Sequence, residues 1–394
     1  MKKESAIHTV GQDRALLHRE TAIFAGKGIA RIHLHPTKAK LRIKIRKIAF
    51  HGATASTYHS SLQTPLMPTP QFFQLHDTAS TTLAQSIRRE LSTGLLAHQA
   101  TVSPKYLYDK LGSALFDAIT ELPEYYPTRT EAAIFQAQKS AFAKHIPAGS
   151  AWFDLGAGSC AKSASLFEAL QPAQYVAIDI STDYLRGVLS NLQQQHPHIA
   201  MSGIGLDFSA SLDLPPALLA SMAKQPVIGF YPGSSIGNFS PSEALAFLKR
   251  IHALCRQGMK GGGVLIGVDL VKPTEFLEPA YDDPLGVTGA FNLNMLRNIN
   301  SLIGSDFDVK DWQHTAFFDT KLSRIEMHVQ ARRDVTVCWP GNTRVFKRGE
   351  SIHTENSYKW TVAGFAELLL QAGFQQPVSW TDAQGWFSVH WARS

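Results

Sequence analysis

The sequence predicts an α/β protein built on a doubly wound, mostly parallel sheet. Residues 151–179 show the pattern of a strand, a glycine turn, a helix and a second strand that ends in an acid. Strand and helix patterns continue to alternate as far as residue 269, and a last helix with a β pair returns only after residue 361. The interruption predicts a second, α+β lobe, formed by the insertion after the fifth strand together with the segment that precedes the sheet.

The stretch Ala151–Asp179 has the form of a mononucleotide-binding βαβ unit. Gly156 and Gly158 lack a Cβ, so the backbone can lie against a ligand, and Asp179 follows at about the 20 residues expected of a ribose-binding acid. The residues fit a dinucleotide loop, a phosphate loop that is one glycine short, and an S-adenosylmethionine loop. The loop alone does not choose among them, and an ordinary strand-to-helix turn also stays open.

The alternation after Asp179 predicts the rest of the sheet. We expect helices over 183–195 and 240–256, the second capped by Ser240 with Glu243, and strands over 199–206, 226–231 and 262–269. Ligands of such sheets bind at the carboxyl ends of the strands. The residues that fall there are Gly156, Asp179, Asp207 and the segment 233–238.

The segment before the sheet contains an amphipathic pattern over 83–96 and a group of aromatic residues. Thr128 and Glu131 have the spacing of a capping box ahead of an apolar-periodic run, so we interpret both as helix initiation. Aromatic side chains beside proline-fixed turns either fill a core or line a pocket, and the sequence leaves both open. The residues concerned are Tyr108, Phe116, Tyr125 and Tyr126.

The insertion shows a helical pattern over 291–303 and strand-like alternation over 324–337 and 351–360. A helix over 362–372 and an alternating run over 377–391 then return to the sheet. We divide the chain into an N-terminal extension (1–70), a helical part of the second lobe (71–145), the core (146–272), the inserted lobe (273–360) and the return to the core (361–394).

Composition excludes several classes of protein. The 44% of hydrophobic residues suffices for a sizeable core, and no run reaches the roughly 18 apolar residues of a membrane helix. The three cysteines, Cys160, Cys255 and Cys338, are odd in number and far apart, which argues against a disulfide framework or a zinc site. We therefore expect a cytoplasmic protein.

The formal charge of +6 is unevenly placed. Residues 1–50 carry twelve Lys or Arg against three acids, so the remaining residues carry a net charge of −3. The basic character therefore belongs to the extension, and we expect no nucleic-acid partner. We expect residues 1–70 to be disordered; a transit peptide is disfavoured by the early acids, and a reading frame that truly starts at Met67 is an alternative.

Five parallel strands followed by a helix and a β pair resemble the class I S-adenosylmethionine methyltransferases, which have a Rossmann-like sheet. The two rival classes fit less well. A phosphate-loop enzyme should keep its second glycine and show a Mg²⁺-binding Asp in an apolar strand. A dehydrogenase should show a catalytic histidine, and neither His252 nor His314 has such a context.

Eight segments, most of them outside the generic cofactor fold, make the resemblance specific. They are KYLYD (105–109), LPEYYPTRTE (122–131), PGSSIGNF (232–239), AYDD (280–283), GVT (286–288), FNLN (291–294), IEMH (325–328) and TENSYK (354–359). From about residue 72 onward the chain resembles the L-histidine N-alpha-methyltransferases of ergothioneine biosynthesis. The resemblance implies transfer of three methyl groups from S-adenosylmethionine to the α-amino nitrogen of L-histidine, which gives hercynine.

The resemblance also implies roles for individual residues. The matching cofactor positions are Tyr108, Gly156, Gly158, Lys162, Asp179, Asp207 and Phe208. The matching substrate positions are Phe116, Tyr125, Gly233, Asn238, Tyr281, Thr288, Met327, Glu355 and Ser357. Tyr108, Asn238 and Tyr281 would take part in catalysis. One position departs from the family: Ala161 stands where an acidic residue usually precedes the loop lysine, which leaves the contacts to the methionine end of the cofactor open.

The family places the substrate carboxylate near Asn238 and Tyr281 and the imidazole at Glu355 and Ser357, which share one face of a strand because they are two residues apart. Methyl transfer from a sulfonium mainly requires alignment and exclusion of water, so we expect neither a metal nor a covalent nucleophile. We expect a monomer with a small-molecule substrate and no membrane partner. Three alternatives stay open: a methyltransferase for another amino acid such as tryptophan or tyrosine, a non-catalytic S-adenosylmethionine-binding protein, and an RNA binder that uses the tail.

Overall fold

The computed structural model of the protein describes residues 23–24, 29–30, 69–75, 81–180, 182–209 and 211–394. The chain divides into two units, residues 1–64 and 65–394. In the first unit, the short strands β1 (Ile23–Phe24) and β2 (Ile29–Ala30) pair antiparallel. The rest of the predicted extension up to residue 68, including Met67, lies outside the described residues.

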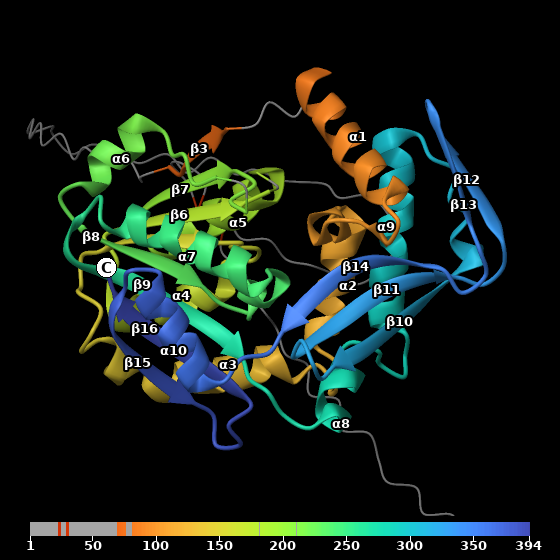
Figure 1. The fold of residues 1–394 in the computed structure, drawn as a ribbon. Helices are drawn as coiled ribbons and strands as arrows, with labels where there is room; N and C mark the ends of the chain where they lie inside the picture. The colour runs from red at the N-terminus through yellow and green to blue at the C-terminus, as the bar shows by residue number, and fades with distance from the viewer. Residues whose placement is uncertain (1–22, 25–28, 31–68, 76–80, 181, 210) are drawn as a thin grey trace, which may run out of the picture. The chain divides into compact units, whose positions relative to one another are not determined.

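The second unit contains an eight-stranded sheet (Figure 1). Its spatial order is β15 (Gln375–Thr381), β16 (Phe387–Arg393), β9 (Met259–Asp269), β8 (Pro226–Tyr231), β5 (Ala151–Leu155), β6 (Gln174–Asp179), β7 (Ala200–Gly205) and β3 (Gln71–Gln74). The strands from β9 to β3 are parallel, and β16 and β15 close the sheet antiparallel. The predicted fold class is therefore confirmed, with β3 as a sixth parallel strand.

Strand β3 was not predicted because its four residues carry no periodic pattern of their own. Phe72 pairs with Gly203 of β7, and a Cβ built on Gly203 would lie 2.8 Å from the Phe72 ring. The missing side chain on β7 therefore makes room for the aromatic ring on β3, a contact between residues far apart in the sequence.

Helices cover both faces of the sheet. One face packs against α6 (Pro216–Met222), α7 (Pro241–Cys255) and α10 (Val362–Gln371), and the other against α3 (Tyr126–Phe142), α4 (Ala161–Leu170) and α5 (Thr182–Gln195). Adjacent strand residues such as Trp152 and Phe153 belong to opposite faces. Because both faces are buried, the strands appear in the sequence as near-continuous apolar runs.

The two capping boxes that the sequence predicts have different outcomes. In α7 the Ser240 hydroxyl and the Glu243 carboxylate form the predicted reciprocal pair. In α3 the prediction is wrong, because the helix already begins at Tyr126, with Pro127 in its first turn. The fixed φ of proline suits the first turn of a helix, so Thr128 lies inside the helix and caps nothing.

The second lobe is built around a four-stranded sheet (Figure 1). Its strands are β10 (Trp312–Asp319), β11 (Arg324–Ala331), β14 (Ser351–Tyr358) and β4 (Ala100–Thr101), with a hairpin of β12 (Val335–Trp339) and β13 (Asn342–Phe346) beside them. The helices are α1 (Thr81–Leu96), α2 (Lys110–Thr120), α8 (Thr274–Leu277) and α9 (Val287–Ile303). Short 3₁₀ turns are η1 (Pro104–Leu107), η2 (Ser235–Asn238), η3 (Glu278–Ala280) and η4 (Val309–Asp311).

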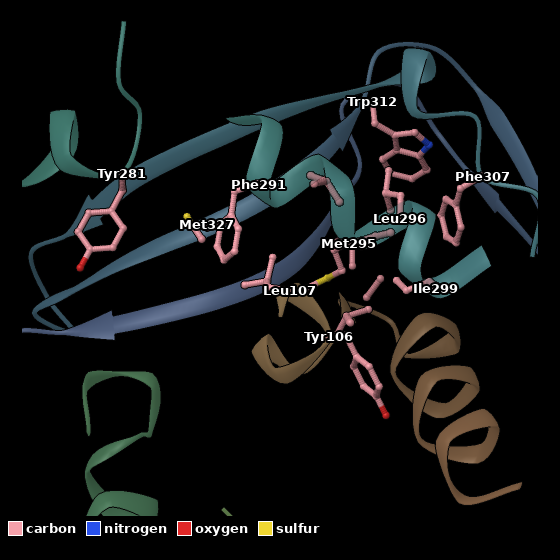
Figure 2. Packing of buried hydrophobic residues seen from close by; sticks show 14 of the residues in the cluster. Tyr106, Leu107, Tyr281, Phe291, Met295, Leu296, Ile299, Phe307, Trp312 and Met327 are labelled. Atoms are coloured by element: carbon pink, nitrogen blue, oxygen red, sulfur yellow. The ribbon is translucent and has the colours of Figure 1, made fainter. Parts of the chain in front are cut away.

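One hydrophobic cluster unites the N-terminal segment with the insertion. Figure 2 shows Met295 and Ile299 of α9 next to Leu107 of η1, with Trp312 of β10 in the same cluster. The C-terminal part of α3, by contrast, contributes Phe142 to the cluster of the large sheet. The segment 71–145 is therefore shared: β3 and α3 pack with the large sheet, and α1, η1 and α2 pack with the second lobe.

Two predicted boundaries in the second lobe are wrong. The alternating run 324–337 is two strands, because the chain turns at 332–334 between β11 and β12. Helix α9 begins at Val287 rather than Phe291. Asp283 causes the earlier start, since its carboxylate accepts hydrogen bonds from the Val287 and Thr288 N–H groups at 3.1 and 2.7 Å.

Candidate active site

Strand β5 ends in the predicted glycine turn. Gly156 has a φ of +76° and Gly158 a φ of +49°, both in the left-handed region that glycine favours. The Gly158 N–H donates to the Asp179 carboxylate at 3.0 Å, so the turn meets the acid at the end of β6. A Cβ on Gly156 would lie 3.5 Å from the Phe208 ring, and one on Gly158 would meet no atom within 4 Å. The turn, the acid and the ring therefore suit a nucleoside that lies along this edge.

Asp207 follows β7 at the same edge of the sheet. Its Oδ2 lies 3.2 Å from Lys105 Nζ, which also pairs with Glu90 Oε2 of α1 at 2.8 Å. Burial raises the pKa of Asp207, but hydrogen bonds from Ser209 and the charge of Lys105 outweigh it, so the pKa lies below its ordinary value. Asp207 is therefore an ionised acceptor at neutral pH.

Glu131 joins the glycine turn to the next loop. It is 0% exposed, its Oε2 lies 2.7 Å from Lys162 Nζ, and its Oε1 accepts the Gly233 N–H at 2.7 Å. A Cβ on Gly267 would come within 1.9 Å of Oε1, so only glycine fits there. The sequence interpretation of Glu131 as a helix cap is corrected: its carboxylate is a structural link between the two loops. Its place in the LPEYYPTRTE motif was the signal that capping alone did not explain it.

A cavity lies between the large sheet and the second lobe. It is lined by Tyr108, Phe116, Ile119, Tyr125, Pro127, Gly233, Ser234, Ser235, Asn238, Ala280, Tyr281, Thr288, Phe291, Met327, Glu355 and Ser357. Every substrate position that the sequence predicts is among them. Gly233 brings the cavity close to the first turn of α4, which follows the glycine turn, since a Cβ there would lie 3.0 Å from Lys162 Nζ. The structure therefore brings the predicted cofactor edge and the predicted substrate residues together.

Aromatic rings form one wall of the cavity. The Tyr108 and Phe116 centroids are 5.6 Å apart, those of Phe116 and Tyr125 are 6.1 Å apart, and both pairs meet edge to face. Burial raises the pKa values of Tyr108 and Tyr125 well above the ordinary value, so both phenols stay neutral. Of the four aromatics noted in the sequence, only Tyr126 does not line the cavity; it hydrogen-bonds to Asp269.

A β-bulge in β14 turns Glu355 toward the cavity. Met327 pairs with Glu355, but the next residue of β11, His328, pairs with His353, so Thr354 is an extra residue. The Thr354 side chain is buried and donates to the Met327 carbonyl at 2.9 Å. Because a bulge shifts the alternation by one residue, Glu355 faces the cavity while His353 lies against His328.

The polar groups of this wall form two close pairs. Asn238 Nδ2 donates to Glu355 Oε1 at 3.0 Å, and Tyr281 Oη lies 2.7 Å from Ser357 Oγ. Desolvation raises the pKa of Glu355 to about 7, although the charge of Lys359 and the Asn238 hydrogen bond oppose the shift. Glu355 therefore titrates close to neutral pH.

Thr288 and Phe291 come from the first turns of α9. The Thr288 N–H is held by Asp283, and its Oγ1 is buried with no hydrogen-bond partner among the described residues. Since Thr288 lines the cavity, a bound molecule can supply the missing partner. Figure 2 shows Phe291 beside Met327 of β11, where the two side chains make an apolar patch.

A buried ionic network behind the cavity was not predicted. Asp269, at the end of β9, pairs through Oδ1 with Lys272 at 2.5 Å and through Oδ2 with Lys359 at 2.8 Å. Tyr126 donates to the same carboxylate at 2.7 Å, and Ser234 Oγ accepts the Asp269 N–H at 2.8 Å. Lys359 is the last residue of the TENSYK motif, and this position was the only sequence signal that could have pointed to the network.

The described residues contain one group with the spacing of metal ligands: Glu326, His328 and His353, whose ligand atoms lie within 4.8 Å of one another. Glu326 already pairs with Arg324, and the two imidazole rings are stacked at an interplanar angle of 21°. Glu326 also pairs with His328, so its carboxylate is already engaged by two side chains, and the Arg324 guanidinium opposes a cation there. We propose no metal there, and the absence of a metal stays a prediction.

The sheet and its ligand edge have the Rossmann-like fold of the class I methyltransferases. Residues 87–394 match the family model described as "Histidine-specific methyltransferase, SAM-dependent". The chain belongs to this family. Within the described residues, no helix is both long and apolar enough to span a membrane.

Three relatives illustrate the similarity. A Histidine N-alpha-methyltransferase of Mycolicibacterium smegmatis is 34% identical over 79% of this chain and 96% of its own length. One of Mycobacterium tuberculosis is 34% identical over 77% of this chain and 94% of its own length. Ergothioneine biosynthesis protein 1 of Neurospora crassa is 32% identical over 70% of this chain, which matches 31% of that longer protein.

Proposed function

We propose that the protein transfers three methyl groups from S-adenosylmethionine to the α-amino nitrogen of L-histidine and so forms hercynine. One observation carries the proposal: the partly buried carboxylate of Glu355 and the buried hydroxyl of Ser357 line the same cavity as Gly233, which is next to Lys162 at the start of α4. The names of the relatives, which include histidine methyltransferases, support the same substrate.

S-adenosylmethionine supplies an electrophilic methyl group on a sulfonium. We assign Asp179 to the ribose, Asp207 and Phe208 to the adenine, and Gly156, Gly158 and Lys162 to the loop that follows β5. The left-handed glycines and the open space beside Gly158 fit these roles. The acid missing at Ala161 has a candidate replacement, because Glu131 places a carboxylate at Lys162 from another helix.

The cavity would orient histidine by its two ends. Glu355 and Ser357 hold the imidazole, and Asn238 with Tyr281 holds the carboxylate. Asn238 already contacts Glu355, and its amide nitrogen has a second N–H for the substrate. Holding both ends fixes the α-amino nitrogen in line with the methyl group and its sulfur leaving group, which is the main contribution required of such an enzyme.

Each transfer needs the free lone pair of the amine, so a proton must leave before the nitrogen attacks. The raised pKa values of the Tyr108 and Tyr281 phenols mean that both are protonated and serve as hydrogen-bond partners rather than bases. The quaternary ammonium of the product would lie against Tyr108, Phe116 and Tyr125. Cation–π contact with these rings is worth roughly 0.5–2 kcal/mol.

The test is to incubate the protein with S-adenosylmethionine and L-histidine and to count the methyl groups added by mass spectrometry. We expect a trimethylated product with all three groups on the α-nitrogen. Tryptophan and tyrosine, assayed in parallel, test the alternative substrates; faster turnover of either would reject histidine as the substrate. Binding without turnover of any amino acid would indicate a non-catalytic S-adenosylmethionine-binding protein.

We further propose that hercynine formation is the first step of ergothioneine biosynthesis here, as the name of the Neurospora crassa relative suggests. A monomer in the cytoplasm, with no metal and no nucleic-acid or membrane partner, also stays a proposal. A reducing compartment is compatible with the cysteines of the described residues, which are all free thiols.

A further inference from the structure

The backbone of Tyr281 is tied to the second lobe at its carbonyl group. The Tyr281 N–H donates to the Glu278 carbonyl within the short turn η3, at 2.9 Å, and the Tyr281 carbonyl lies 2.8 Å from Nε2 of His314. His314 belongs to β10, which pairs with β11 along its whole length. The loop that leads from Tyr281 to α9 is exposed, with Leu285 at 79%. The His314 contact therefore fixes the start of an exposed loop to a paired strand.

The other ring nitrogen of His314 is held by α9. Nδ1 lies 2.9 Å from Asn292 Nδ2, and the same amide nitrogen donates to the His328 carbonyl at 3.0 Å. The His314 side chain is buried, but His314 is not among the residues that line the cavity. The ring therefore reaches the site only through Tyr281.

Two carbonyl groups fix the tautomer of the His314 ring. A carbonyl only accepts, so the Tyr281 contact places the ring proton on Nε2. The His328 carbonyl likewise requires the NH₂ group of Asn292 on its side, so Nδ1 of His314 accepts and carries no proton. Burial lowers the pKa of His314, which keeps the ring neutral at pH 7. Both ends of the chain of contacts give the same tautomer.

We infer that His314 is a positioning residue that places the Tyr281 hydroxyl against the carboxylate of the substrate. The inference rests on the proposed function, which assigns Tyr281 to that carboxylate, and deepens it. The hydroxyl contacts Ser357 at 2.7 Å and Lys359 at 2.8 Å, at the end of β14. A tyrosine side chain has a fixed length, so its hydroxyl stays there only while the backbone keeps its distance from β14. His314 sets that distance from β10, whichever of the two hydroxyls donates to the other.

Two substitutions separate the two contacts of the ring. The side-chain oxygen of asparagine extends about as far as Nδ1, so His314→Asn keeps an acceptor for Asn292 and loses the contact to Tyr281. The amide nitrogen of glutamine extends about as far as Nε2, so His314→Gln keeps the Tyr281 contact and loses the other. The quantity measured is the Kd of L-histidine, by titration calorimetry with S-adenosylhomocysteine present. We expect a Kd about tenfold higher in His314→Asn and within about threefold of the wild-type value in His314→Gln.

A double-mutant cycle tests whether the effect passes through the Tyr281 hydroxyl. Tyr281→Phe keeps the ring and the backbone carbonyl and removes only this hydroxyl, and by itself it should weaken histidine binding. Adding His314→Asn to Tyr281→Phe should change the Kd by less than about threefold, because the group that His314 places is already gone. A purely structural role of His314 would raise the Kd by the same factor in both backgrounds.

His390→Asn is the matched control. His390 is also a buried histidine with both ring nitrogens in contact, 2.8 Å from the hydroxyls of Ser379 and Ser388, but it lies on β16 and does not line the cavity. We expect this variant to lose stability in urea and to keep the wild-type histidine Kd.

An unchanged Kd in folded His314→Asn, or the same increase in both backgrounds, overturns the inference. His314→Gln decides the matter when His314→Asn does not fold: a Kd within about threefold of the wild-type value supports the inference, and a tenfold increase overturns it. Methylation of histidine by the wild-type protein leaves the proposed function standing in either case. Wild-type protein that neither binds nor methylates histidine overturns the proposed function and the inference together.

Discussion

Replacing Glu131 by glutamine tests whether this buried carboxylate holds the two loops of the site together. Its two oxygens accept from Lys162 Nζ and from the Gly233 N–H, each at 2.7 Å. Glutamine keeps the shape but has only one acceptor oxygen, so its NH₂ must face either Lys162 or Gly233. One charge-assisted hydrogen bond is therefore lost, at about 1.5–3 kcal/mol.

The magnitude depends on which contact breaks. Lys162 is 36% exposed and can turn its ammonium to water, whereas the Gly233 N–H is fixed. We therefore expect the lysine contact to break, and its loss to cost a free energy at the lower end of this range. This corresponds to about tenfold weaker binding of S-adenosylmethionine, measured by titration calorimetry. Glu90→Gln is the control, because Glu90 pairs with Lys105 in a half-exposed contact. Such a contact is worth at most about 1 kcal/mol, which corresponds to an at most fivefold change in affinity.

The reasoning fails if Glu131→Gln binds S-adenosylmethionine as tightly as the wild-type protein. Urea unfolding must be cooperative for both proteins, so that weaker binding cannot be attributed to a partly unfolded variant. A loss of affinity in Glu90→Gln as large as that in Glu131→Gln would also refute it, since burial would then not distinguish the two carboxylates.

Three further predictions concern the cavity and the glycine turn. Glu355→Ala should weaken histidine binding by roughly 10- to 150-fold and leave S-adenosylmethionine binding intact; an unchanged histidine affinity in calorimetry would remove Glu355 from the site. The pKa of Glu355 rises from 4.5 to about 7 on folding, so the folded protein holds an extra proton between these values and its stability falls as the pH rises through them. Glu355→Gln should therefore raise the free energy of unfolding near pH 8 by on the order of 1–3 kcal/mol, and urea denaturation that shows a decrease would contradict the desolvation of this carboxyl. Gly156→Ala and Gly149→Ala both force alanine to a φ above +70°, at a cost of about 1–2 kcal/mol each, but only Gly156→Ala should weaken S-adenosylmethionine binding; equal affinities would separate Gly156 from the cofactor.

Much of the fold and the site follows from local sequence signals. The glycine turn and the acid about 20 residues later were found because a left-handed turn and a strand-end carboxylate leave a recognisable spacing. The shared direction of Glu355 and Ser357 follows from the period of a strand. The strand β3 was missed because four residues without a helical partner carry too little pattern.

The errors at α3 show where local signals mislead. Thr128 and Glu131 satisfy the spacing of a capping box, and nothing nearby contradicts it. The actual partners of Glu131, Lys162 and Gly233, lie 31 and 102 residues further along the chain. The bulge at Thr354, which keeps Glu355 aimed at the cavity, likewise depends on pairing with β11.

By itself the sequence determined the parallel sheet and its ligand edge, because periodicity and glycine conformation act over a few neighbouring residues. The residues that meet in the cavity were expected only from the resemblance of short motifs to a known family. Only the tertiary structure decided that Glu131 links two loops and that Lys359 and Lys272 share one buried carboxylate. The physical reason is that a charge is stable inside a protein only with its partner in contact, and these partners come from different elements.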